Sequence, residues 1–216
     1  MFLVIDLHQL NQFTLPIVNQ AFDLWKSVYT EILENADEIL VPDYFYKCKI
    51  LSVIYENDIV QAFTLHNIYN LSANGVCDLS YFSPLNEFTK KKLKHEGHKV
   101  WTCEWVTVHP DFRGHFTKIQ LGEVIMGLAF KLFSELDCTS AMGFSRKDIK
   151  ADRMAEKFGF ISIDTIVRHG IECGVMFLKK ESLLRHPYEK TQIKIDSLYE
   201  NKTIYSNILP SHTEAA

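Results

Sequence analysis

A strand-like run that turns through a basic, glycine-containing loop into a long apolar segment constrains this chain more than any other feature. The run is Glu104-Trp-Val-Thr-Val, the turn is Pro110-Asp111, and the loop begins with Arg113-Gly114. This order is typical of a buried strand that leads into a helix. The first amides of a helix lack internal partners and carry partial positive charge, so the ingredients of an anion site are present. A pyrophosphate-bearing ligand is therefore the first functional hypothesis.

The remaining hydrophobic patterns predict a mixture of strands and helices. Two β-rich runs, residues 49–55 and 59–65, flank Asn57-Asp58, whose side chains favour turns, and so predict a hairpin. A second hairpin is predicted around His169-Gly170. Further strands are predicted over residues 2–7, 100–108 and 140–144, and helices over residues 15–36, 86–95, 119–136 and 148–158. This alternation predicts an α/β (α+β) fold in which a central mixed β-sheet is flanked by helices on both faces.

Length and composition indicate how the chain is divided. A chain of 216 residues suits one compact domain, which we expect to occupy residues 1–186. After Pro187 the composition turns polar, with only a few interspersed apolar residues. Residues 187–216 are therefore expected to form a peripheral or partly disordered C-terminal extension that folding does not require.

Charge and residue usage argue against several classes of protein. The net charge of −4 gives no overall basic field for a nucleic acid. No apolar run reaches the roughly 18 residues that cross a bilayer, and the N-terminus lacks the features of a signal peptide. Five scattered cysteines without a CxxC pair favour reduced thiols, so we expect a cytoplasmic protein with no membrane partner. His95 and His98 lack a third ligand, so no metal site is predicted.

Two short motifs separated by one helix length carry the most specific signal. The first is Val108-x-Pro110-x-x-Arg113-Gly114, and the second combines four spaced residues, Ala151, Lys157, Gly159 and Phe160. In register and spacing they resemble the phosphate motif and the following helix motif of the GNAT superfamily of acyl-CoA N-acyltransferases. The resemblance covers about residues 49–180 and implies the GNAT-like mixed sheet.

The resemblance also implies a reaction and a donor site. Acetyl-CoA or a longer acyl-CoA would be the co-substrate, and a small primary amine would attack its thioester directly through a tetrahedral intermediate. Backbone groups of Val106, Thr107 and Val108 would hold the pantetheine arm and the acyl carbonyl. Asp148 stands where the family has an asparagine near the ligand. The pyrophosphate would lie on the loop residues Arg113, Gly114, His115, Phe116, Thr117 and Lys118.

Three positions depart from the family pattern. Phe116 and Lys118 replace two glycines that let backbone amides approach the pyrophosphate. Lys118 offers a charge in compensation, whereas Phe116 reshapes the loop. Ala155 replaces the tyrosine that often protonates the leaving thiolate, so another group or solvent has to supply that proton.

Glu104 is the candidate catalytic base. On an ideal strand it shares a face with Val106 and Val108, in a run apolar enough to be central. Burial there raises the pKa of a carboxyl, which suits a base that works near neutral pH. The alternative is a structural carboxylate paired with a lysine, an arginine or a hydroxyl.

Neighbouring residues are given structural roles. Cys103 is expected to be a small buried residue, because no histidine pattern accompanies it. Trp101 and Trp105 are expected in the core, with the lining of an acyl pocket as the alternative for one of them. Arg168-His169 are expected to be exposed turn residues, and the alternative implied by the resemblance is that this edge borders the acceptor substrate.

Two other functions stay open beside an acyl-CoA-dependent enzyme. One keeps the fold and takes the acyl group from acyl carrier protein, as synthases of N-acyl amino acids or acyl-homoserine lactones can. The other is a catalytically silent GNAT-like binding or regulatory module, which Ala155 favours. The oligomeric state is also open, with a homodimer among the alternatives.

Overall fold

A computed structural model describes residues 1–114 and 119–206, and in this part of the chain nine strands form one mixed sheet. Along the sheet the order is β7-β8-β6-β5-β3-β2-β1-β9, and β4 pairs with β5 off this path. The strands are β1 (Phe2–Asp6), β2 (Ile50–Glu56), β3 (Ile59–His66), β4 (Ile68–Asn70), β5 (Lys99–Val108), β6 (Ser140–Arg146), β7 (Ile161–Arg168), β8 (Ile171–Lys179) and β9 (Thr203–Tyr205). The helices are α1 (Thr14–Glu34), α2 (Asp43–Tyr46), α3 (Glu87–Glu96), α4 (Leu121–Glu135), α5 (Ala151–Glu156) and α6 (Glu189–Glu200), and single 3-10 turns cover Val76–Asp78, Pro110–Phe112 and Lys180–Ser182.

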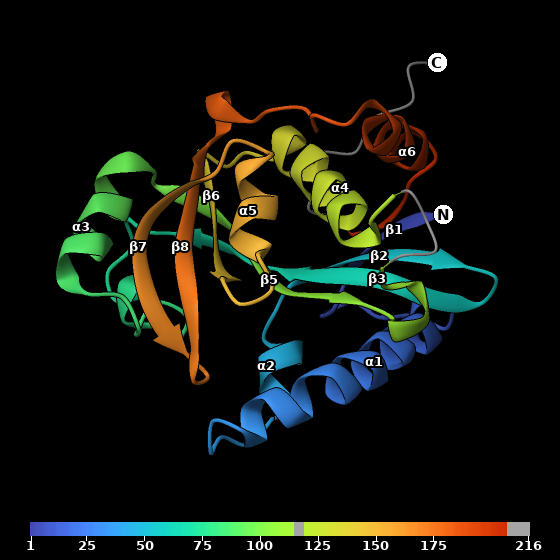
Figure 1. Ribbon diagram of the computed structural model, residues 1–216, viewed down its shortest axis with the longest axis horizontal. Coiled ribbons are helices and arrows are strands. Elements are labelled where there is room, and N and C mark those ends of the chain that lie inside the picture. Colours follow the sequence, from blue (N-terminus) through green and yellow to red (C-terminus); the bar gives the residue numbers. More distant parts are fainter. Residues whose placement is uncertain (115–118, 207–216) are drawn as a thin grey trace.

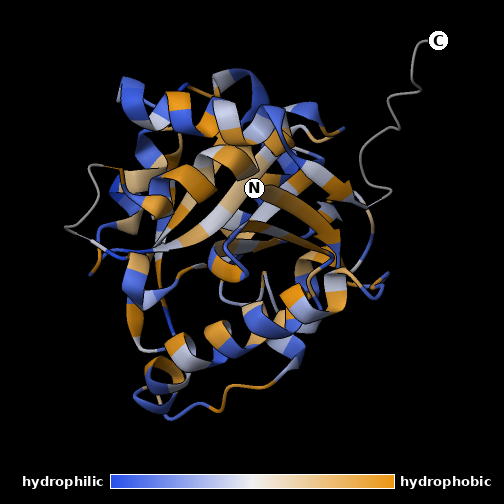
Figure 2. Ribbon diagram, turned by 90° about the vertical axis from the view of Figure 1, so that its right-hand side faces the viewer, coloured by the Kyte–Doolittle hydropathy of each residue, from blue (hydrophilic) through white to orange (hydrophobic). Residues whose placement is uncertain are grey.

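Helices cover both faces of the sheet (Figure 1). Helix α4 packs on β2, β3 and β5 from one side, and α1 packs on β3 and β5 from the other. Each helix buries a hydrophobic cluster of its own against the sheet, one containing Phe130 and the other Trp25. Figure 2 shows hydrophobic residues concentrated along the strands, whereas the helices mix hydrophobic and hydrophilic residues. The predicted fold class is confirmed.

Both predicted hairpins form, and the backbone at their turns explains why. Asn57 and Asp58 have φ angles of 53° and 60°, and His169 and Gly170 have 51° and 69°. Two successive residues in the left-handed region make the tight turn whose twist matches that of paired strands. Asn, Asp and Gly tolerate this conformation best, so the sequence signal has a direct backbone cause.

An irregularity in β5 opens the sheet at its centre. On β3, Phe63 and Leu65 are two residues apart, but their partners on β5, Thr107 and Glu104, are three apart. The additional residue is a β-bulge, at which Trp105 has a φ of 51°. On its other side, β5 pairs with parallel β6 only as far as Cys103. Beyond that residue β5 and β6 are no longer paired with each other, which leaves space between the two strands.

The C-terminal extension is not wholly peripheral. Helix α6 packs on α4, with Ile195 and Tyr199 almost completely buried, and β9 extends the sheet in parallel with β1. Gly127 of α4 provides the space, because a Cβ atom there would lie 2.2 Å from Ile195 Cδ1. The division at residue 186 stays a prediction, but the expectation of a peripheral segment is wrong for residues 189–205. Thr191, Ile195 and Tyr199 repeat every four residues, which puts them on one helix face despite the polar composition.

Candidate active site

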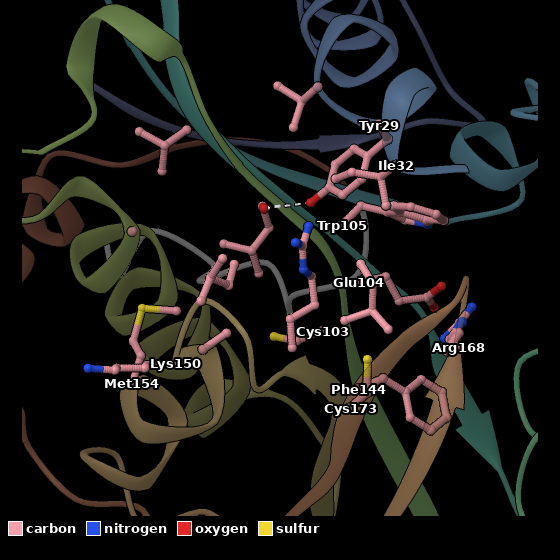
Figure 3. Close-up of a pocket in the computed structure, with 18 of the residues that line it drawn as sticks. Tyr29, Ile32, Cys103, Glu104, Trp105, Phe144, Lys150, Met154, Arg168 and Cys173 are labelled. Carbon is pink, nitrogen blue, oxygen red and sulfur yellow. Dashed lines mark hydrogen bonds between the residues drawn. The ribbon is translucent and has the colours of Figure 1, made fainter. Parts of the chain in front are cut away.

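A cleft of about 750 Å³ lies where β5 and β6 separate. The second half of β5 forms one wall, and β6 with the β7–β8 hairpin forms another (Figure 3). Side chains of α1, the first turn of α4, and α5 complete the lining. The bulge at Trp105 is part of this lining, so the irregularity of β5 and the cleft occur at the same place.

Glu104 occupies a polar niche in the wall of the cleft. Its Oε1 atom accepts hydrogen bonds from Thr102 Oγ1 at 2.9 Å and from Asn67 Nδ2 at 3.2 Å. The residue is only 5% exposed, and among the described residues its Oε2 atom has no hydrogen-bond partner. One oxygen therefore fixes the carboxylate, and the other is buried at the cleft wall without a partner, which is unusual for a polar atom.

The surroundings of Glu104 affect its protonation in opposite directions. Burial raises the pKa of this carboxyl above its ordinary value, while the charges of Lys47 and Arg168 and the bonds from Thr102 and Asn67 oppose the rise. Burial is the largest of these effects. A carboxyl with a raised pKa accepts a proton more readily, which is the property a general base requires.

The backbone carbonyls of β5 after the bulge carry side-chain hydrogen bonds. The Tyr29 hydroxyl, from α1, donates to Val106 O at 2.8 Å, and Arg113 Nε donates to Val108 O at 2.7 Å. Val106 and Val108 line the cleft, whereas Thr107 is buried and its hydroxyl donates to Trp105 O at 2.8 Å. A carbonyl oxygen has two lone pairs, so each of these acceptors retains capacity for a second donor.

The lining is richer in cations than the chain as a whole. Six cationic and three acidic side chains contribute to it: Arg113, Arg146, Lys150, Arg153, Lys157 and Arg168, and Glu31, Glu104 and Glu123. The first turn of α4 also faces the cleft through Gly122, which presents no side chain. A helix N-terminus beside a surplus of positive charge favours a polyanion.

Several of these cations already have carboxylate partners. Arg146 pairs with Asp148 through contacts of 2.6 and 3.1 Å, and Arg153 pairs with Glu156. Lys157 pairs with Glu123, whose second oxygen lies 3.1 Å from Nε2 of the buried His186. Among the described residues no such pair is found for Lys150, which has a left-handed backbone at the start of α5.

Of the residues predicted to bind the diphosphate, only some lie in the part of the chain that the structure describes. Arg113 lines the cleft, and Gly114 adopts a φ of 81° that favours glycine. His115, Phe116, Thr117 and Lys118 lie outside the described residues. Asp148 is not part of the lining, because its carboxylate is turned to Arg146, which takes a place there instead. The binding roles of all these residues stay predictions.

Arg168 and Trp105 both line the cleft, which for each was the alternative to the main expectation from the sequence. Arg168, expected to be an exposed turn residue, is half-buried, with its guanidinium 4.7 Å from the ring centroid of Phe144 and 5.5 Å from that of Tyr81. Trp105 lines the cleft, whereas Trp101 is fully buried as expected.

Tyr29 belongs to the cleft but was not singled out from the sequence. The helical period of residues 15–36 predicts that Tyr29 faces the sheet, but it does not say which strand it reaches. In the structure the Tyr29 ring packs edge-on against Trp105, with centroids 4.8 Å apart. The hydroxyl is thereby directed to the carbonyl of Val106.

Cys103 also lines the cleft, but its surroundings do not activate it. Burial raises the pKa of its thiol to about 12, and burial lowers the pKa of neighbouring His66 to about 3. The two side chains are 3.7 Å apart, so both are neutral near pH 7 and neither assists the other as a nucleophile and base.

In the described part of the chain, no cluster of three or more histidine, cysteine or acidic residues is arranged to hold a metal ion. No helix there is both long and apolar enough to span a membrane.

Comparisons with known proteins place the fold. No protein-family model matches the sequence, and neither does any curated protein. Solved structures do match. An agmatine N-acetyltransferase is 12% identical, with 82% of this chain and 99% of that one covered and a TM-score of 0.59. A CoA-dependent acyl-homoserine lactone synthase, BjaI, is 14% identical, with 94% of this chain and 92% of that one covered and a TM-score of 0.57. The mosquito protein arylalkylamine N-acetyltransferase-like 5b is 11% identical, with 83% of this chain and 100% of that one covered and a TM-score of 0.56.

Proposed function

We propose that this chain, which has the fold of the GNAT acyl-CoA N-acyltransferases, transfers an acyl group from acyl-CoA to an amine. The observation that carries the proposal is Glu104, a buried carboxylate with one fixed and one free oxygen, in the cleft where β5 and β6 separate. Burial of such a group is costly unless it is compensated. Its position in a large cleft supports a role toward a ligand.

The reaction follows from this position. Glu104 Oε2 takes a proton from the ammonium group of the acceptor, and the nitrogen lone pair attacks the thioester carbonyl carbon. The new C–N bond gives a tetrahedral intermediate, which collapses as the C–S bond breaks. The nitrogen gives up its second proton to solvent and the leaving sulfur takes up a proton, so that an amide and free coenzyme A result. The protein contributes alignment of the two reactants and the proton transfer.

The cleft fits an acyl-CoA donor in size and charge. Its volume of about 750 Å³ accommodates an acyl-pantetheine arm together with a small acceptor. Arg113 and Lys150 supply positive charge to the cleft that the first turn of α4 also lines, and we expect the diphosphate at that helix end. The backbone of Val106 and Val108 would hold the pantetheine amides through the remaining lone pairs of their carbonyls.

Tyr29 is the candidate donor of the proton to sulfur. It would take the role of the family tyrosine, whose position is occupied by Ala155 in this chain. Ala155 is buried in α5 and has no group to donate. The Tyr29 hydroxyl lies on Val106, along the strand that would hold the thioester arm. Burial raises the pKa of this phenol, so it is protonated at neutral pH and can act as an acid.

A longer acyl donor is the second candidate. The acyl-homoserine lactone synthase aligns with 94% of this chain, whereas the two acetyltransferases align with 82% and 83%. That synthase is CoA-dependent, so the observation supports a longer acyl-CoA, and an acyl carrier protein donor stays an alternative proposed from the sequence alone. Calorimetric titration with coenzyme A, followed by product analysis with acetyl-, decanoyl- and carrier-protein-bound donors, separates the two candidates. Binding without any transfer would instead indicate a silent module.

A further inference from the structure

Arg168 is a cation in the cleft that forms no ion pair with a carboxylate of the described residues. It is the last residue of β7 and is half-buried in the cleft wall beside the hairpin turn. Its interactions are with the faces of Phe144 and Tyr81, at 4.7 and 5.5 Å from the ring centroids. No hydrogen bond or ion pair to another described residue satisfies its N–H groups. This distinguishes it from Arg146, which is paired with a carboxylate in the same cleft.

The two rings position the guanidinium without consuming its hydrogen bonds. Contact with an aromatic face uses the flat surface of the group and leaves its N–H edge directed elsewhere. That edge carries five donors in a fixed fork, which matches the two oxygens of a carboxylate. An arginine that is held in this manner is preorganised for a planar anion.

Glu104 supplies the complementary charge in the same part of the cleft. Figure 3 shows the Glu104 and Arg168 side chains next to each other. Their electrostatic coupling opposes the effect of burial on the pKa of Glu104, but the two groups form no ion pair. One carboxylate oxygen and one guanidinium edge are thus both unsatisfied. A ligand with an ammonium and a carboxylate would satisfy both, whereas a simple amine would leave Arg168 unpaired in a filled cleft.

We propose that the acceptor is an amine that also carries a carboxylate, that is, an α-amino acid or a close analogue. Its carboxylate pairs with the guanidinium of Arg168, and its amine lies at Oε2 of Glu104. This inference rests on the proposed acyl transfer and narrows its acceptor. The product is an N-acyl amino acid, which retains the carboxylate and therefore the contact with Arg168.

Binding of two product analogues tests the carboxylate site without requiring turnover. N-acetylphenylalanine and N-acetylphenethylamine differ only in the carboxylate, and each is titrated calorimetrically into the protein with coenzyme A present. We expect the acid to bind the wild-type protein roughly tenfold to a hundredfold more tightly. In Arg168→Met, which keeps the length of the side chain but not its charge, the difference should disappear. Arg168→Lys should retain part of it.

A matched control separates the site from a general loss of charge. Arg185 is exposed, pairs with Asp196 at 3.0 Å and lies outside the cleft, so Arg185→Gln should keep the full preference for the acid. Each variant is first shown to melt cooperatively. Equal binding of the two analogues by the wild-type protein overturns the inference without any variant, and so does a full preference in Arg168→Met.

Transfer assays distinguish this inference from the reaction on which it rests. With an acyl-CoA donor, kcat/KM should be larger for phenylalanine than for phenethylamine in the wild-type protein, and the ratio should approach one in Arg168→Met. Equal acylation of both amines by the wild-type protein overturns the inference and leaves the proposed reaction intact. Selective binding of the acid with no acylation of either amine supports the carboxylate site and overturns the reaction.

Discussion

Replacement of Glu104 by glutamine should nearly abolish acyl transfer without weakening the fold. A glutamine keeps the shape of the side chain, and its amide oxygen can accept the same bonds from Thr102 and Asn67. Only the ability to accept a proton is removed. Loss of a general base typically lowers a rate by about 10²–10⁴, so kcat should fall by that factor. The affinity for coenzyme A should stay the same, because the substitution does not change Arg113 and Lys150, the cations proposed to bind the diphosphate.

The same substitution has a predictable dependence on pH. Since burial raises the pKa of Glu104 in the folded protein, the ionised form is costlier there than in the unfolded chain. The wild-type protein therefore loses stability relative to Glu104→Gln as pH rises from the ordinary carboxyl pKa to the raised one. Above the raised pKa the difference is constant. Glu104→Gln should melt at the same or a higher temperature than the wild type near pH 7.

Stopped-flow or continuous thiol-release assays and thermal melts measure both effects. The acidic limb of the wild-type rate profile, which reports ionisation of Glu104, should be missing in Glu104→Gln. Glu31→Gln, which removes an exposed carboxylate from the rim of the cleft, serves as the control and should retain activity. Transfer by Glu104→Gln at the wild-type rate over about pH 6 to 9 would refute the assignment of the base.

Three further predictions follow from the contacts of the cleft and the core. Tyr29→Phe should lower kcat by about 10² with little change in coenzyme A affinity, because general acids contribute at least this much. An unchanged kcat would indicate that solvent protonates the leaving sulfur. Arg113→Ala should weaken coenzyme A binding by about tenfold or more in calorimetry. An unchanged affinity would show that Arg113 does not contact the diphosphate. Ile195→Ala should lower the free energy of unfolding by about 2–5 kcal/mol, whereas Ile193→Ala, 59% exposed on the same helix, should stay within about 0.5 kcal/mol; equal effects would contradict the docking of α6.

The sequence predicted those parts of the fold that depend on local conformation. Asn57-Asp58 and His169-Gly170 specify their turns through backbone preferences, so both hairpins were found. The transition from β5 to α4 was also found, although α4 begins at Leu121 rather than at residue 119. Helix α6 was missed because its polar composition conceals a buried face that repeats every four residues, at Thr191, Ile195 and Tyr199. The small residue against which this face packs, Gly127, is distant in the sequence.

The candidate site was only partly predictable, since it depends on contacts between distant elements. Glu104 could be identified from its place in an apolar strand. The half-buried position of Arg168 could not be predicted, because it results from the packing of the hairpin against Tyr81 and Phe144, which no local pattern encodes. Tyr29 approaches the strand from another helix, so the absence of a tyrosine at Ala155 did not point to it as the proposed proton donor.

The formation of an amide together with free thiol tests the central claim most directly. The wild-type protein is incubated with an acyl-CoA and a pool of amines and amino acids, and thiol release and acylated products are quantified by absorbance and mass spectrometry. We expect one thiol for each amide formed, and the loss of both signals in Glu104→Gln. Coenzyme A binding without any amide product, or thiol release that yields only the free acid, would contradict the assignment of the chain as an N-acyltransferase.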